Sequence, residues 1–256
     1  MLKWSDANAK TKALAQVPSL KQYLQNKRKI YSLDLISGWS CPMAMDCLSR
    51  VHVIEGRKKI VDGKFTKFRC FSASQEVAYP HVYNSRKHNF DLLRDCKSSD
   101  DMLQLFLASM PDNLGICRIH VGGDFFNRMY FLAWLSLAEL HPDRLFYAYT
   151  KSLPYWIKYR DYVDSLPNFV ITASYGGRHD SLIKSEGLRY AVVLDTMDKL
   201  MKNKLEVDHD DSHAADPSKK RKSFALLIHN TQPAGSEASQ VLQYQRKNKV
   251  KHSYAR

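Results

Sequence analysis

The stretch that decides the fold is residues 30–47, IYSLDLISGWSCPMAMDC. Its first part, residues 30–36, is a short apolar run typical of a buried strand. The run breaks at Ser37-Gly38, and a polar loop interrupted by proline then carries Cys41 and Cys47. We therefore expect a strand whose carboxyl end leads directly into a cysteine-bearing loop.

A third cysteine, Cys70, follows a predicted β-hairpin. We expect its strands over residues 51–55 and 58–67, and Asp62-Gly63 is a strong two-residue turn signal. Alternatively, the turn falls at Glu55-Gly56 and the second strand is shorter. In either case the hairpin returns the chain to near its start, so Cys70 is expected beside the other two cysteines.

Cys41, Cys47 and Cys70 suit a metal or cluster better than a disulfide, because a disulfide would leave one thiol over. Thiolates of this kind hold zinc or iron–sulfur clusters. The alternative is that the three are unrelated small residues, since free cysteine is often simply buried. The polar loop around Cys41 and Cys47 favours the metal or cluster.

Length and composition indicate a globular protein. The chain has 256 residues, of which 44% are hydrophobic and 25% charged, enough for one sizeable core with appendages. It has no apolar run of 18 residues and no apolar signal-peptide core at its start, so we expect no membrane span and no secretion. Five cysteines without a secretion signal fit a reducing cytoplasm.

The net charge of +13 favours anionic partners such as nucleic acid. The basic residues concentrate in residues 10–29, in residues 219–222 and in the tail from residue 246. These segments either form a nucleic-acid-binding face or are solvated surface and frayed tail.

Strands and helices alternate along most of the chain, which predicts a parallel sheet covered by helices. Six such units make either an open doubly wound sheet or an incomplete barrel, and both bind ligands at the carboxyl ends of the strands. Residues 1–29 are expected as a lead-in, loosely ordered up to residue 18, residues 30–235 as the α/β domain, and residues 236–256 as a last helix and basic tail. After residues 30–36, the predicted strands are residues 116–121, 145–150, 169–173, 190–194 and 223–228, and the predicted helices are residues 99–109, 127–140, 154–163, 181–186, 197–205 and 236–248.

The turn Gly122-Gly123-Asp124 follows the second of these strands directly. Two glycines let the backbone approach a ligand closely or adopt positive φ, and Asp124 can then accept a hydrogen bond from an amine or a ribose hydroxyl. The alternative is a tight strand-to-helix turn with Asp124 near the helix N-terminus.

A cysteine loop after the first strand and a Gly-Gly-acid turn after the second resemble the radical S-adenosylmethionine (SAM) enzymes. In that superfamily three cysteines bind a [4Fe-4S] cluster, whose fourth iron chelates SAM, and a Gly-Gly-Glu turn holds the amino group of SAM. The resemblance implies a partial (β/α)6 barrel, with the hairpin inserted in the cysteine loop, and a reductant as partner. It also implies cluster ligands Cys41, Cys47 and Cys70 and cofactor-binding residues Gly122, Gly123, Asp124, Thr150 and Ser174. The spacing differs, since five residues separate the first two cysteines and 22 the next pair, against C-x3-C-x2-C in the superfamily, and Asp124 replaces the usual Glu.

More narrowly, four segments resemble the gene-product-eighty-eight family of phages and plasmids. This resemblance implies a phage or plasmid origin and a place in the cytoplasm of the host bacterium. The expected function is that of an iron–sulfur protein, a radical SAM-like enzyme of unknown substrate. The alternatives are a nucleic-acid-binding protein with a structural or redox-sensing cluster, and a zinc-stabilised module. The four segments are SCP (residues 40–42), CFSA (70–73), VGGDF (121–125) and VDHDDSHAADP (207–217).

The Asp- and His-rich segment 208–216 offers carboxylates that suit a hard metal. The alternative, which we favour, is an acidic, solvated loop. Of the other polar residues on predicted strands, His120 is expected in the core or behind a ligand, and Tyr147 and Tyr149 are expected to pack on one strand face.

Overall fold

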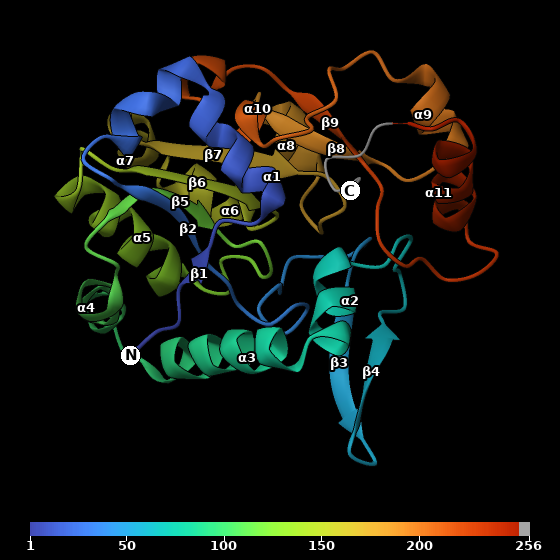
Figure 1. Cartoon of the computed structure of the whole chain (residues 1–256), viewed down its shortest axis with the longest axis horizontal. Helices are drawn as coiled ribbons and strands as arrows, with labels where there is room; N and C mark the ends of the chain where they lie inside the picture. Colours follow the sequence, from blue (N-terminus) through green and yellow to red (C-terminus); the bar gives the residue numbers. More distant parts are fainter. Residues whose placement is uncertain (251–256) are drawn as a thin grey trace.

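A seven-stranded, mostly parallel sheet forms the centre of the protein in the computed structural model, which describes residues 1–250 (Figure 1). The strand order is β1-β2-β5-β6-β7-β8-β9. The short β1 (Ser5–Asp6) pairs antiparallel with β2, and all the other pairs are parallel. The parallel strands are β2 (Lys29–Leu33), β5 (Leu114–Ile119), β6 (Leu145–Thr150), β7 (Phe169–Ser174), β8 (Tyr190–Leu194) and β9 (Phe224–Leu227).

The six predicted strands are therefore confirmed, and they pair in the order in which they occur in the chain. A doubly wound sheet has a point at which the strand order reverses, and this sheet has none among residues 1–250. The doubly wound sheet is therefore excluded, and the observed sheet is open, with β1 and β9 as its edge strands.

Long helices cover one face of the sheet and bury its larger core. Trp134 and Phe131 on α5 pack with Phe106 on α4 and Phe146 on β6, all fully buried. The helix predicted over residues 154–163 is present but is divided into two at Tyr159, where the backbone leaves the helical region and the ring packs near Phe131. The helices around this core are α3 (Pro80–Asp95), α4 (Ser99–Ser109), α5 (Arg128–Leu140), α6 (Leu153–Lys158), α7 (Arg160–Ser165) and α8 (Ser181–Ser185). Helices α9 (Met197–Lys202) and α11 (Glu237–Lys247) pack together with Ile228 in a separate, smaller core.

The N-terminal segment covers the other face of the sheet. Leu14 and Leu20 are fully buried and pack against Ile116, Leu145 and Tyr147. Residues 1–18 are thus part of the fold, and the expected loosely ordered lead-in is wrong. The physical reason is that the strands are apolar on both faces, so the second face also needs a cover. The elements that supply it are α1 (Ala9–Lys12), η1 (Ala13–Gln16), η2 (Pro18–Leu24), α10 (Ser212–Ala215) and η3 (Pro217–Lys219).

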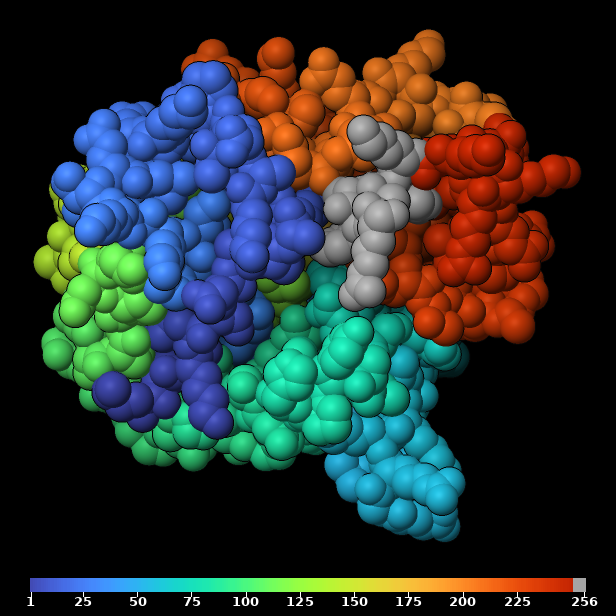
Figure 2. All heavy atoms as spheres, in the orientation of Figure 1, coloured from blue at the N-terminus to red at the C-terminus, as the bar shows by residue number. Residues whose placement is uncertain are grey.

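The hairpin is inserted between β2 and β5, as expected, and projects from the body as an arm (Figures 1 and 2). Its strands are β3 (Ser49–Ile54) and β4 (Arg57–Asp62). The turn is Glu55-Gly56, with φ of 51° and 73°, as a two-residue turn of positive φ requires. The alternative turn is therefore confirmed, and the prediction of a turn at Asp62-Gly63 is wrong because the ladder ends at Asp62.

Helix α2 (Phe71–Ala78) begins immediately after Cys70 and was not predicted. No helix among residues 1–250 is both long and apolar enough to cross a membrane. The end of the basic tail, residues 251–256, lies outside the described residues.

Candidate functional site

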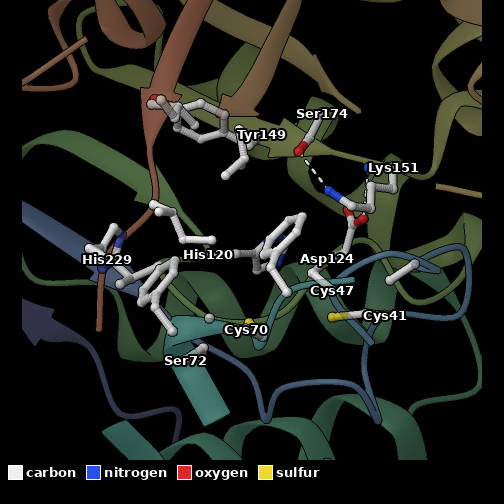
Figure 3. A pocket seen from close by; sticks show the side chains of 18 of the residues that line it. Cys41, Cys47, Cys70, Ser72, His120, Asp124, Tyr149, Lys151, Ser174 and His229 are labelled. Carbon is white, nitrogen blue, oxygen red and sulfur yellow. Dashed lines mark hydrogen bonds between the residues drawn. The ribbon is translucent and has the colours of Figure 1, made fainter. Parts of the chain in front are cut away.

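A pocket opens at the carboxyl ends of the parallel strands, and Figure 3 shows the side chains around it. Its volume is about 190 Å³, against about 10–15 Å³ for one water molecule, so it can hold a small molecule or cluster. All eight residues predicted as ligands or cofactor contacts line this one pocket: Cys41, Cys47, Cys70, Gly122, Gly123, Asp124, Thr150 and Ser174.

The loop after β2 is held by a buried ion pair from the next two helices. Glu76 on α2 accepts hydrogen bonds from the backbone N–H (2.9 Å) and the hydroxyl (2.8 Å) of Ser37. Arg86 on α3 lies 3.2 Å from Glu76 and donates at 2.7 Å to the Ser72 hydroxyl. Both charged side chains are almost fully buried, so the pair fixes the start of the cysteine loop against α2.

The base of the hairpin brings Cys47 and Cys70 to the same place. The Asp46 carbonyl oxygen accepts hydrogen bonds from the backbone N–H groups of Lys67 (2.7 Å) and Phe68 (3.1 Å). The backbone N–H of Cys70 donates to the Ser49 hydroxyl at 3.3 Å. The hairpin thus returns the chain beside the first two cysteines, as the sequence predicts.

All three pocket cysteines are free thiols. Burial raises the pKa of the Cys41 thiol, and nearby Asp124 and Cys70 raise it further. Burial, followed by the charge of Cys47, raises the pKa of Cys70. No group of three or more His, Cys, Asp or Glu side chains among residues 1–250 is already arranged around an ion position. The donors are therefore gathered on one wall without a preformed coordination geometry.

Close packing explains why Gly122 and Gly123 are glycines. A Cβ at Gly122 would lie 2.2 Å from the Ser72 hydroxyl oxygen, and one at Gly123 would lie 2.7 Å from the Leu35 Cβ. Gly123 also has φ of 103°, which side chains disfavour. The turn is thus pressed against both the cysteine loop and α2, and this packing is sufficient reason for the two glycines.

Asp124 ties this turn to the end of β6. Its carboxylate accepts hydrogen bonds from the Thr150 hydroxyl (2.6 Å) and from the backbone N–H groups of Lys151 (2.8 Å) and Phe125 (2.7 Å). Burial raises the pKa of Asp124, although these hydrogen bonds work in the opposite direction. The Lys151 ammonium in turn donates to the Ser174 hydroxyl at 2.6 Å. These residues therefore form one polar wall opposite the hairpin base.

His120 is buried at the edge of the pocket, as expected for a core histidine. Its Nε2 lies 2.9 Å from the Tyr130 hydroxyl, and its Nδ1 has no hydrogen-bond partner among the described residues. Burial, with a smaller effect of Arg118, lowers the pKa of His120 to about 3. The imidazole is therefore neutral at physiological pH and offers one unused ring nitrogen.

The Asp- and His-rich segment contributes Asp208 and His209 to the pocket lining and is largely buried, so the expectation of a solvated acidic loop is wrong. Asp211 is fully buried and contacts Lys10 at 2.8 Å, Arg118 at 2.6 Å and the Tyr147 hydroxyl at 3.0 Å. Burial works to raise the pKa of Asp211, but the two cations outweigh it and the pKa is lowered. Since cations occupy this carboxylate, and Lys10 also lies 4.0 Å from Asp208, the segment stabilises the fold through ion pairs.

Lys10 and Arg118 line the pocket without having been predicted there. For Arg118 a signal exists: Arg118 and His120 alternate with Cys117 and Ile119, so two polar residues share one strand face. Lys10 has no such signal, because its partners lie some 200 positions away in the sequence. Tyr147 and Tyr149 do share a strand face, as expected, but their hydroxyls donate to Asp211 and Asp208.

The predicted basic segments are partly occupied by contacts within the protein. In the run 219–222, Lys219 donates to the Ser212 hydroxyl at 3.4 Å and Lys220 to the Leu166 carbonyl oxygen at 3.2 Å. Arg221 and Lys222 are exposed. Two of the four residues in this run are therefore engaged in contacts within the protein.

Comparison with known proteins gives one family. The family model described as gene product 88 matches residues 2–249. The gene 88 protein of Mycobacterium phage L5 is 31% identical over 90 residues, and that of Mycobacterium phage D29 is 32% identical over 91 residues. Each match covers 32% of this chain and 38% of the relative, so the matched region spans well under half of either protein. No solved structure matches the chain.

Proposed function

The chain belongs to the gene product 88 family, and we propose that it is an iron–sulfur protein of radical SAM-like architecture. In this proposal Cys41, Cys47 and Cys70 ligate a [4Fe-4S] cluster. The observation that carries it is that three free thiols, two from the loop after β2 and one from the start of α2, line one pocket at the carboxyl ends of a parallel sheet. The strand order, which does not reverse, is compatible with a partial barrel.

The chemistry of the donor set fits such a cluster. Thiolates are its usual protein ligands, and none of the three cysteines is used in a disulfide. Because no ion site is preformed, the thiols must lose protons and turn toward a common centre, which couples metal binding to local rearrangement. A bound cluster would supply one-electron chemistry, which protein side chains do not provide.

The opposite wall would bind and orient a small polar ligand such as SAM. Asp124 already accepts three hydrogen bonds, and a carboxylate has about four acceptor positions, so one position remains for a ligand amine. Lys151 holds Ser174 at the rim. The neutral His120 offers its free Nδ1 from the side.

Anaerobic reconstitution with iron and sulfide tests the proposal. We expect the wild-type protein to bind iron and sulfide in equal amounts and to show broad visible absorbance. Cys41→Ala, Cys47→Ala and Cys70→Ala should each lose this absorbance, because each removes one of three ligands. SAM cleavage by the reconstituted protein, reduced with dithionite, then tests the enzymatic part separately.

Two other cysteines provide matched controls. Cys117 is buried within β5, and Cys96 follows α3, outside the pocket. Their alanine variants should keep the iron and the absorbance. Full iron retention in the Cys70 variant would refute the ligand assignment, and zinc bound without sulfide would favour the zinc-stabilised module.

A further inference from the structure

The hairpin and its return segment are richer in positive than in negative charge. Residues 49–69, the hairpin and its return segment, contain seven Lys or Arg and two Asp or Glu. One of these acids, Asp62, is paired with Arg69 at 2.6 Å. The hairpin also projects well beyond the body in the space-filling view (Figure 2). Positive charge is thus concentrated on an exposed, protruding element.

The two faces of the hairpin differ. Cross-strand pairing places Ser49, Val51 and Asp62 on one face, and the first two of these are buried. On this inner face the Lys58 ammonium lies 4.4 Å from the ring centre of Tyr83 on α3. The inner face is therefore the one that the protein covers.

The outer face is basic and has no carboxylate on either strand. It consists of three cross-strand pairs, Arg50 with Val61, His52 with Lys59, and Ile54 with Arg57. Arg57 and Lys59 are exposed, and neither has an ion-pair partner among residues 1–250. Two unpaired cations and a third nearby, spaced along one strand ladder, make a surface suited to phosphate groups.

Trp39 extends this outer face toward the cysteine loop. Its ring lies 5.2 Å from that of His52 and 4.8 Å from the Arg50 guanidinium carbon. The side chain is nonetheless 46% exposed. An exposed indole beside cations is a common contact for nucleic-acid sugars and bases.

We propose that the outer face of the hairpin binds duplex DNA. A two-stranded ribbon fits the major groove, which is about 12 Å wide, whereas the major groove of duplex RNA is too narrow. A single strand would need several stacking aromatic rings, and the two strands of this face carry none besides His52. The inference does not depend on a bound cluster, and it locates the contact away from residues 219–222.

Fluorescence anisotropy with a labelled 20-base-pair duplex, at several salt concentrations, tests this binding on the full chain. We expect log affinity to fall linearly with log salt. The double variant Arg57→Glu/Lys59→Glu should lower the affinity at least about tenfold and reduce the slope by roughly 2, since each lost phosphate contact contributes about 0.9. Both positions are exposed, and a thermal melt verifies that the variant folds.

The matched control is Arg221→Glu/Lys222→Glu, which changes the net charge equally. These exposed residues precede β9, at the amino ends of the strands, whereas the hairpin follows the carboxyl end of β2. The control should retain affinity within about threefold. Equal losses in both variants would overturn the proposal, because binding would then follow net charge alone.

Trp39 gives an independent readout. Duplex binding should change the tryptophan fluorescence of the wild type, and Trp39→Phe should remove most of the change. The proposal fails if no duplex binds at low salt, or if a single strand or duplex RNA binds as tightly. It also fails if the hairpin variant binds the duplex like the wild type and has lost only its binding to vesicles of anionic lipid. The same holds if it has lost only self-association.

Discussion

Asp211 is a buried carboxylate that pairs with two cations of the pocket lining, Lys10 and Arg118. It lies at φ of 63°, a left-handed conformation that Asp and Asn tolerate better than most residues. Lys10 comes from the N-terminal segment and Arg118 from β5, and both contact this one carboxylate. A single side chain thus joins three distant parts of the chain, and its charge compensates two nearly buried cations.

Asp211→Asn should therefore destabilise the protein by about 3 kcal/mol, at the low end of the range for breaking a buried ion pair, because Asp208 remains nearby. Asparagine keeps the volume and tolerates the backbone conformation, so the loss reports the charge. Urea denaturation measures it. Asp198→Asn, in an exposed pair with Lys202, should leave the midpoint almost unchanged. Equal midpoints for all three proteins would show that the buried pair contributes nothing.

At the residue scale, the pocket-lining residues at strand ends could be predicted, but Lys10 and its buried partner Asp211 could not. Cys41, Asp124 and Ser174 follow apolar runs directly, and parallel strands bring their carboxyl ends to one edge. Lys10 and Asp211 meet only because the N-terminal segment folds across the second face of the sheet. Nothing local in the sequence marks that contact.

Helix α2 is the element that assembles the cysteine wall. It begins at Phe71, directly after Cys70, contacts the hairpin, and supplies Glu76 to the loop after β2. Its sequence, FSASQEVA, is short and lacks a long apolar face, which is why it was not predicted. The turn predicted at Asp62-Gly63 is wrong because both candidate turns contain glycine. Local sequence does not distinguish them, and the pairing of all residues along the two strands places the turn at Glu55-Gly56.

Packing of α2 against the Gly122 turn can be tested by a double-mutant cycle. Gly122→Ala should cost about 1–3 kcal/mol, as overpacking does, since its Cβ would meet the Ser72 hydroxyl at 2.2 Å. Ser72→Ala removes that oxygen, so the double variant should be more stable than the sum of the two single losses predicts. Denaturation of the four proteins gives the coupling. Strictly additive losses would mean that the turn relaxes away from α2.

On the scale of the whole molecule, the sheet positions everything else. The alternation of apolar strands and helices predicted its six parallel strands, and the strand order then places the cysteine loop, the Gly122 turn and the end of β6 around one pocket. The cover on the second face could not be predicted, because residues 1–29 contain only short apolar groups broken by proline. The three thiols in that pocket come from segments that are also joined by the hairpin base and by the hydrogen bonds of Glu76 to Ser37.

A cluster bound by these thiols would therefore cross-link the loop after β2, the hairpin base and α2. Ligands that bind only the native state stabilise it by mass action, so removing the cluster with a chelator and an oxidant should lower the melting temperature of reconstituted protein by several degrees. Hydrogen exchange should increase most in residues 37–78, because the cross-link constrains those residues directly. Cys47→Ala, carried through the same reconstitution and chelation, should show no shift, whereas Cys117→Ala should shift like the wild type. If the reconstituted protein retains iron yet melts identically before and after chelation, the iron is not held between these segments.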